Sequence, residues 1–111
     1  MNIEKKEDNG IITLSLDGRL DTVSSPKFQE VLMPTIDQAE ISTTNEVTKE
    51  IKIDFEKVVY VSSAGLRVLL IGQKTANAKK ISMKIYNVSN EIMEVFEMTG
   101  FMSILKIVSS N

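Results

Sequence analysis

The chain contains no histidine, no cysteine and no tryptophan among its 111 residues. Without histidine it lacks the usual general base near neutral pH and the commonest nitrogen ligand for metal ions. Without cysteine it can form no disulfide, thiolate nucleophile or zinc–thiolate site. Because these absences remove much of enzyme chemistry from the chain's own residues, we expect a protein that is not an enzyme and that binds no metal or cofactor.

Strong charge of one sign and long apolar runs are also missing. The formal net charge is −2, which offers no basic footprint for a nucleic acid. The first eight residues are mostly charged, where a signal peptide would need an apolar run, and no apolar stretch is long enough to span a bilayer. These features predict a cytoplasmic protein that binds no nucleic acid and does not insert into a membrane.

Strands are predicted where apolar and polar residues alternate. Such stretches lie near residues 2–6, 12–16, 51–55 and 81–85, and the apolar run 58–61 should carry buried chain to a turn. A strand, a helix and another strand in succession imply parallel pairing. We therefore expect an α/β fold, with one domain over residues 1–111. It should contain a mixed, mainly parallel sheet of four to five strands with helices packed mainly on one face.

Helices are predicted after three starts that carry serine, because a serine oxygen can cap the free N–H groups of a first turn. These starts are Ser24-Ser25 before a proline, Ser62-Ser63, and Ser89. Pro34 should kink or end the first helix, and residues 37–50 should form a loop. The second helix should close near residues 79–80. The third should end at Gly100, with an inner face of Ile92, Val95, Phe96 and Thr99.

The second of these starts has a special position, because a buried strand runs directly into Ser62-Ser63-Ala64-Gly65. This geometry places both serines at the surface, at the positive end of a helix dipole, where free N–H groups favour an anion. Serine is also among the commonest N-caps, so a purely structural role for Ser62 or Ser63 remains open from these residues alone.

Residues 54–70, DFEKVVYVSSAGLRVLL, resemble the signature of STAS domains, the family of the bacterial anti-sigma factor antagonists. Two further segments match this family in the right order. Gly18-Arg19-Leu20-Asp21 resembles the turn after the family's second strand, and residues 94–101 resemble its last helix and cap. The resemblance covers nearly the whole chain and implies the STAS fold.

The resemblance also implies a phosphorylation switch. In such proteins an anti-sigma factor that is also a serine kinase phosphorylates a serine at this helix start. The unphosphorylated antagonist binds the kinase, the phosphorylated form is released, and a PP2C-type phosphatase resets the switch. Many relatives read aspartate–serine–serine/threonine–glycine–leucine. Aligned on Gly65, Ser62 replaces the aspartate and Ala64 replaces the second hydroxyl residue, so Ser63 is the expected phosphoacceptor and Ser62 the second choice.

The remaining site residues follow from the same resemblance. Asp21 and Gly65 should support the site, although Asp21 is equally well explained as a turn-forming aspartate. The residues expected to contact the partner are Ser62, Ser63, Ala64, Leu66 and Arg67. We expect a monomer or weak dimer. Two alternative functions stay open: a phosphorylation-independent STAS accessory subunit of a transport complex, and a module that binds a nucleotide or another small ligand.

Overall fold

The computed structural model describes residues 1–44 and 50–108, and of residues 40–44 it describes the backbone alone. Within these residues one sheet has the strand order β1-β2-β3-β4. The strands are β1 (Asn2–Asp8), β2 (Ile11–Leu20), β3 (Glu50–Val61) and β4 (Met83–Tyr86). β1 and β2 form an antiparallel hairpin, and β2, β3 and β4 are parallel to one another. The predicted mixed, mainly parallel sheet is confirmed.

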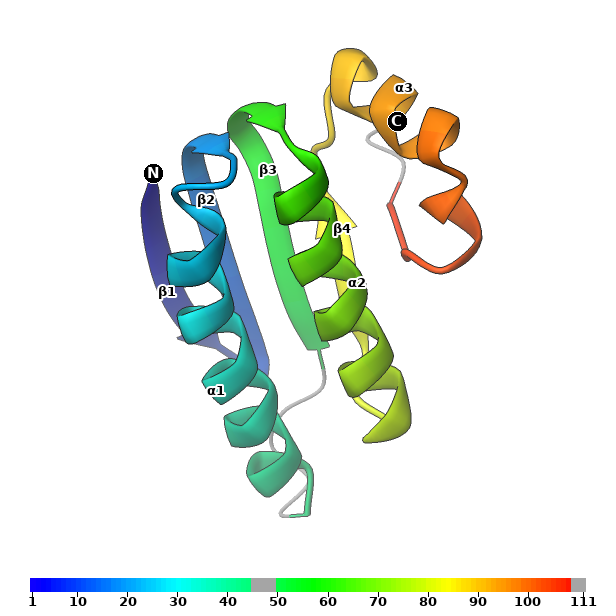
Figure 1. The fold of residues 1–111 in the computed structure, drawn as a ribbon. Coiled ribbons are helices and arrows are strands. Elements are labelled where there is room, and N and C mark those ends of the chain that lie inside the picture. Colours follow the sequence, from blue (N-terminus) through cyan, green and yellow to red (C-terminus); the bar gives the residue numbers. More distant parts are fainter. Residues whose placement is uncertain (45–49, 109–111) are drawn as a thin grey trace.

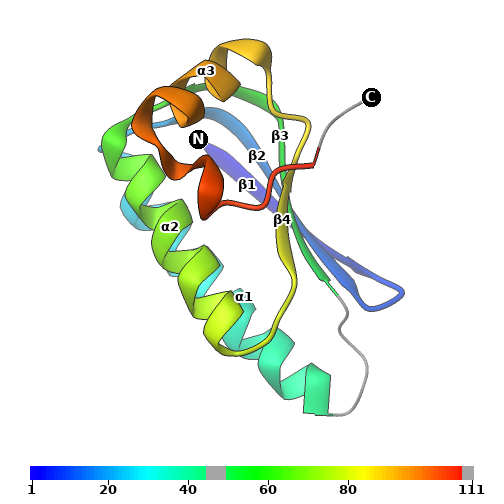
Figure 2. The same ribbon diagram turned by 90° about the vertical axis from the view of Figure 1, so that its right-hand side faces the viewer.

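The helices pack mainly on one face of this sheet, as expected (Figures 1 and 2). They are α1 (Ser25–Thr44), α2 (Ser63–Ala78) and α3 (Asn90–Thr99), followed by the short 3₁₀ helix η1 (Phe101–Ser103). α1 connects β2 to β3, and α2 connects β3 to β4. Because β2 and β3 are parallel neighbours, their carboxyl ends lie at one edge of the sheet, and both helices begin there.

The prediction for the end of the first helix is wrong. α1 continues through Pro34 to Thr44, so residues 37–44 are helical rather than a loop; residues 45–49 lie outside the described part of the chain. Proline removes only one N–H donor, the one that would bond the carbonyl of Glu30. Glu30 and Pro34 are both exposed, so water can bond that carbonyl instead. On the opposite side the helix buries Ile36 and Ala39 in the core, and this packing favours its continuation.

The second half of β3 departs from the predicted pattern. Val58 and Val61 are buried, but Val59 is 68% exposed and Tyr60 is 41% exposed. Two register shifts against β2 insert extra residues into β3, as β-bulges do. Each shift changes which side chains point inward, so the apolar run is not buried throughout. The strand still delivers the chain to the predicted helix start.

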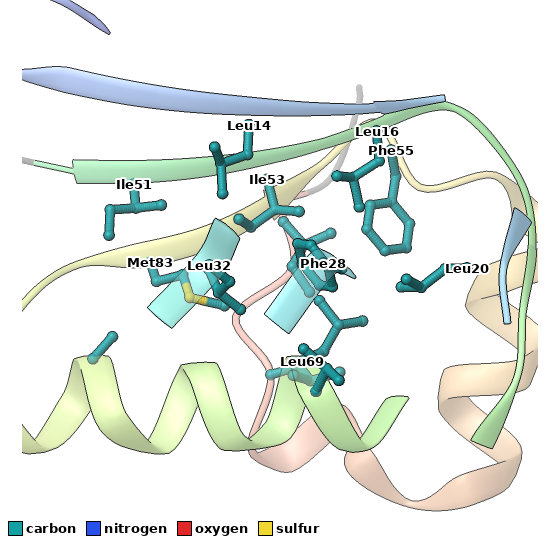
Figure 3. Packing of buried hydrophobic residues seen from close by; sticks show 14 of the residues in the cluster. Leu14, Leu16, Leu20, Phe28, Leu32, Ile51, Ile53, Phe55, Leu69 and Met83 are labelled. Carbon is teal, nitrogen blue, oxygen red and sulfur yellow. The ribbon is translucent and has the colours of Figure 1, made fainter. Parts of the chain in front are cut away.

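The core lies between the sheet and the two long helices, with α3 closing one end (Figure 3). α1 contributes Phe28 and Leu32, and α2 contributes Leu69. From α3, Phe96 is buried with its ring centroid 6.2 Å from that of Phe55 on β3. Along the strands the inward residues are Ile12, Leu14, Leu16, Ile51, Ile53, Phe55, Met83 and Ile85. The predicted alternation of these strands is therefore confirmed.

The last helix shows both predicted caps. The Ser89 hydroxyl accepts the Ile92 N–H at 3.2 Å, and Gly100 takes the left-handed conformation with φ 76°. Its inner face is narrower than expected, because Thr99 is exposed. Beyond η1, Ile107 forms an isolated parallel bridge with Ile85 at the outer edge of β4. The segment after α3 thus extends the sheet by one bridge.

Candidate functional site

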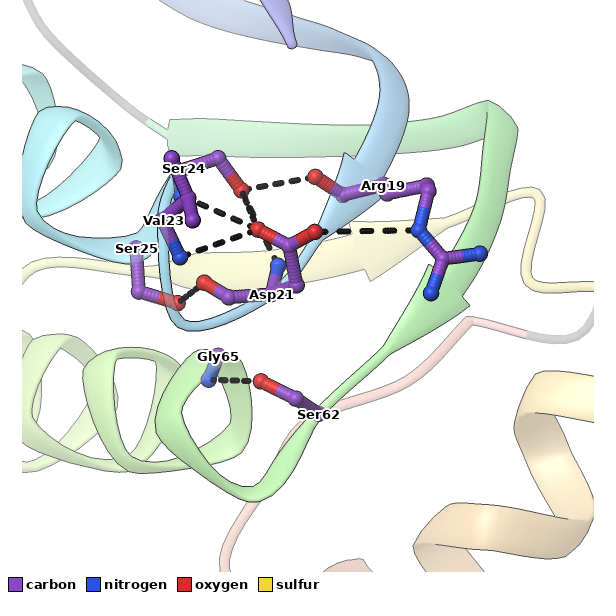
Figure 4. Close-up of polar contacts among 7 residues, drawn as sticks. All are labelled: Arg19, Asp21, Val23, Ser24, Ser25, Ser62 and Gly65. Atoms are coloured by element: carbon purple, nitrogen blue, oxygen red, sulfur yellow. Dashed lines mark hydrogen bonds and ion pairs between the residues drawn. The ribbon is translucent and has the colours of Figure 1, made fainter.

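The candidate site is the junction where β3 ends and α2 begins. Ser62 is the N-cap of α2 with extended backbone angles, and its Oγ accepts the Gly65 N–H at 3.3 Å (Figure 4). The Ser62 N–H donates to the Leu20 carbonyl at 2.9 Å, which joins the end of β3 to the end of β2. The Ser62 hydroxyl therefore has the structural role of a cap.

Ser63 occupies a different environment from its neighbour. It is the first residue of α2, its side chain is exposed, and its hydroxyl makes no hydrogen bond with any other described residue. The free N–H groups and positive dipole end of α2 lie beside it. Of the two serines, Ser63 is thus the one with an exposed side chain and a hydroxyl that the described residues leave unbonded. Its role as the phosphoacceptor stays a prediction.

Gly65 is needed where it stands because two elements approach closely there. A Cβ atom at this position would lie 2.7 Å from the Leu20 Cγ and 2.8 Å from the Leu20 carbonyl oxygen. Such distances are too short for any side chain without movement of the backbone. Gly65 therefore allows the first turn of α2 to pack on the end of β2. This packing sets the position of the first turn, which carries Ser63.

Leu66 does not belong to the exposed part of the site. It is buried in the core, so the prediction that its side chain contacts a partner is wrong. Leu66 and Leu69 are three residues apart and face the sheet together. The helical spacing of apolar residues in the sequence could have identified Leu66 as a core residue rather than a surface residue of this motif. Arg67 is exposed, and Ala64 is half-buried.

Asp21 organises the turn that leads from β2 into α1. Its Oδ1 accepts the N–H groups of Ser24 at 3.0 Å and Val23 at 3.1 Å (Figure 4). The Ser24 N–H that donates to Asp21 holds the pKa of this carboxyl below its usual value, and the Ser24 hydroxyl, the Val23 N–H and Arg19 add to the effect. The Asp21 carboxylate makes no hydrogen bond with Ser62 or Ser63. It therefore acts as a turn-forming aspartate beside the site.

A contact that the sequence reasoning missed lies next to this turn. The Arg19 guanidinium lies 4.2 Å from the centroid of the Tyr60 ring, and its Nε lies 3.6 Å from Asp21 Oδ2. Arg19 thus connects the end of β2 to the end of β3 through a cation–π contact and an ion pair. No local signal in the sequence could have shown this, because the contact depends on the shifted register of β3.

The surface beside Ser63 is only slightly hollowed. A shallow cleft of about 170 Å³ lies between the starts of α1 and α2. It is lined by Thr22, Ser25, Pro26, Gln29, Ala64, Arg67 and Val68. A larger hollow of about 360 Å³ lies on the sheet face away from α1 and α2, where its lining is mostly charged and contains neither Ser62 nor Ser63. The serine junction is thus shaped as an exposed surface for contact rather than as an enclosed ligand pocket.

The described residues contain no group of three or more acidic side chains placed to hold a metal ion. None of the helices there has the length and apolar character that crossing a membrane requires.

Comparison with protein families places this architecture in a known class. The family model described as "STAS domain" matches residues 2–110. The chain therefore belongs to the STAS domain family, and the resemblance found in the sequence is confirmed.

Individual relatives and solved structures are similar to this chain over nearly its whole length. The anti-sigma-B factor antagonist of Bacillus subtilis (strain 168) is 26% identical over 107 residues, which cover 96% of this chain and 90% of that protein. An anti-sigma factor antagonist from Mycobacterium paratuberculosis has a solved structure with a TM-score of 0.77 and 14% identity, covering 98% of this chain and 86% of that one. The structure of the Bacillus cell fate determinant SpoIIAA in its phosphorylated form matches with a TM-score of 0.69 and 16% identity. The match covers 98% of this chain and 93% of that one. At these identities the two solved structures show that the fold is shared.

Proposed function

We propose that this STAS domain, residues 1–111, is an anti-sigma factor antagonist controlled by phosphorylation of Ser63. The unphosphorylated chain binds an anti-sigma factor that is also a serine kinase, and the phosphorylated chain is released. The family membership and the relatives named as anti-sigma factor antagonists support this role. The observation that carries the choice of Ser63 is its exposed hydroxyl, free of hydrogen bonds to the described residues, at the first position of α2.

In the phosphorylation reaction this chain supplies only the Ser63 hydroxyl, and the kinase supplies ATP and the base. The Ser63 Oγ forms a bond to the γ-phosphorus of ATP held by the kinase, the bond to the β–γ bridging oxygen breaks, and ADP leaves. The hydroxyl proton passes to a base of the kinase, which suits a chain that contains no histidine. A PP2C-type phosphatase resets the switch by hydrolysing the phosphoserine with water, which restores the hydroxyl and releases inorganic phosphate.

The physical effect of the phosphate is local. A phosphoserine adds about −1.5 to −2 charges and three acceptor oxygens. At a helix N-terminus this charge is tolerated, because the dipole and the free N–H groups favour it. The modification should therefore leave the fold intact and instead alter the charge of the surface on which a partner docks. That surface comprises Ser62, Ser63, Ala64 and Arg67 with the turn at Asp21, and it excludes the buried Leu66.

The test uses the serine-kinase anti-sigma factors encoded in the same genome. Each is incubated with the purified chain and ATP, and the product is mapped by mass spectrometry. We expect one phosphate on Ser63. Ser63→Ala should bind the kinase but should not be released when ATP is added. Ser103→Ala changes another exposed serine, in η1, and should behave as the parent.

Two results would contradict the proposal. Phosphate on neither Ser62 nor Ser63 would remove the proposed site. If Ser63→Ala and Ser63→Asp both bind and dissociate as the parent does, the chain acts independently of phosphorylation. That outcome would favour an accessory subunit of a transport complex, which a pull-down of a transporter ATPase would then reveal.

A further inference from the structure

Arg67 stands one helical turn after Ser63 on α2, and both side chains are exposed. Residues four apart lie on the same face of a helix, and helical side chains lean toward the N-terminus. A phosphate on Ser63 would therefore stand on the helix face that carries Arg67, at the spacing of an i, i+4 pair. An acidic group four residues before a basic one is also the more favourable order for such a pair.

Arg67 is not engaged elsewhere among the residues that the structure describes. It takes part in no ion pair, hydrogen bond or ring contact with them. Arg19, the other arginine of this region, differs because it is held by Asp21 and Tyr60. Arg67 thus keeps the donors of its guanidinium fork available, and it borders the shallow cleft between α1 and α2. A guanidinium fork can bond two oxygens of one phosphate group.

We propose that Arg67 binds the phosphate on Ser63 within the same chain. This inference rests on the proposed function, since it concerns the released, phosphorylated form. In that form the phosphate engages the one exposed cation of the first two turns of α2 and removes it from the surface offered to the partner. Release then has two causes: a new negative charge at Ser63, and the loss of a free positive charge at Arg67.

The test installs phosphoserine at position 63 during translation, so that it does not depend on any kinase. Titration followed by ³¹P NMR gives the midpoint of the second ionisation of the phosphate, which is about 6 without neighbouring charges. A bound guanidinium favours the dianion and lowers this midpoint. Arg67→Gln should therefore raise it by about 0.3 unit or more. Arg67→Lys, which keeps the charge but not the fork, should give an intermediate value.

The matched control is Lys74→Gln, which removes the same charge from an exposed position seven residues further along α2. It should leave the midpoint unchanged, while the charged residues near the α1 start (Arg19, Asp21 and Lys27) are the same in every variant. Equal midpoints in the parent and in Arg67→Gln would overturn the inference, and so would equal shifts in Arg67→Gln and Lys74→Gln. Since the phosphate is installed without a kinase, failure of the kinase to label Ser63 would contradict the proposed function alone.

Discussion

α1 and α2 begin at the same edge of the sheet with a pair of serines each, and the two pairs differ in how many of their hydroxyls are hydrogen-bonded. Figure 4 shows the three bonded ones, Ser24, Ser25 and Ser62. At the start of α1 both hydroxyls donate to backbone carbonyls. Ser24 Oγ donates to the Arg19 carbonyl at 2.6 Å, and Ser25 Oγ donates to the Asp21 carbonyl while its side chain is buried. At the start of α2 only Ser62 is engaged, and Ser63 is exposed.

The difference arises from the chain that precedes each helix. Residues 21–24 separate β2 from α1, and this turn folds back over the helix start. The Arg19 carbonyl at the end of β2, the Asp21 carbonyl and the Asp21 carboxylate then accept hydrogen bonds from the two serines. β3 instead runs into α2 with only Ser62 between them. No turn covers Ser63. Both serines are thus structural where a turn folds over the helix start, whereas only the capping serine, Ser62, is structural where the strand enters the helix directly.

The largest effect should follow from disturbing the close approach that lets β3 enter α2 directly. Gly65→Ala places a Cβ 2.7 Å from the Leu20 Cγ. We expect overpacking to lower the free energy of unfolding by about 1–3 kcal/mol, measured by urea denaturation. Ala64→Ser, in the same turn but half-buried, is the control and should stay within about 0.5 kcal/mol of the parent. A Gly65→Ala protein as stable as the parent would show that Leu20 yields and that the junction is not rigid.

Removing one serine hydroxyl from each helix start tests whether the serines of α1 are structural and Ser63 of α2 is not. Ser25→Ala loses the hydrogen bond from a buried hydroxyl to the Asp21 carbonyl and should cost about 1 kcal/mol of unfolding free energy. Ser63→Ala removes an exposed hydroxyl that has no hydrogen-bond partner among the described residues, and it should change stability by less than about 0.5 kcal/mol. Equal losses in the two variants would mean that Ser63 also has a structural role.

A somewhat smaller effect is expected for Ser62→Ala, which removes the N-cap of α2. The bond to the Gly65 N–H is long, at 3.3 Å, so we expect a loss near the lower end of the usual range, about 0.5–1 kcal/mol. Ser62→Asp is the matched control, because aspartate caps as well as serine and should restore the parent's stability. If Ser62→Ala is as stable as the parent, the capping bond contributes nothing and the two serines of α2 are equivalent.

Much of the fold could be predicted because its signals are local. Ser89 and Gly100 mark the ends of α3 by their own backbone and side-chain preferences, and both caps are present. The end of α1 could not be predicted in this way. Pro34 is a local stop signal, but the burial of Ile36 and Ala39 against distant parts of the chain outweighs it. Local signals define an element best where long-range packing agrees with them.

In the candidate site, too, some features could be predicted from local signals and others could not. The motif predicts a helix start with two serines, but the sequence does not say which hydroxyl the cap uses; that follows from the hydrogen bond between Ser62 and Gly65. The contact of Arg19 with Tyr60 was also out of reach, because it requires the two register shifts that move β3 against β2. Pairing between strands distant in the sequence sets both the shape and the charge of this edge of the sheet.

The smallest effect should come from the charge that holds the covering turn of α1. The pKa of Asp21 is lowered in the folded chain, chiefly because the Ser24 N–H donates to its carboxylate. Since the folded pKa lies below the ordinary value of 3.8, the ionised carboxylate stabilises the fold above that pH, and this contribution is lost as the pH falls through the folded pKa. Asp21→Asn keeps an acceptor oxygen but no charge. It should therefore be slightly less stable than the parent at neutral pH, by less than Ser62→Ala, and the difference should disappear in acid.

Thermal unfolding of both proteins from neutral pH into acid measures this difference. The matched control is Asp17→Asn, which neutralises an exposed acid of β2 outside the turn. If the gap between the parent and Asp21→Asn does not close as the pH falls, the carboxylate charge does not stabilise the turn. If Asp17→Asn shows the same closing gap, the effect reflects net charge rather than the hydrogen bonds of Asp21. In either case the charge of Asp21 would not be what holds the turn over Ser24 and Ser25, and the contrast between the two helix starts would rest on hydrogen bonds that do not depend on it.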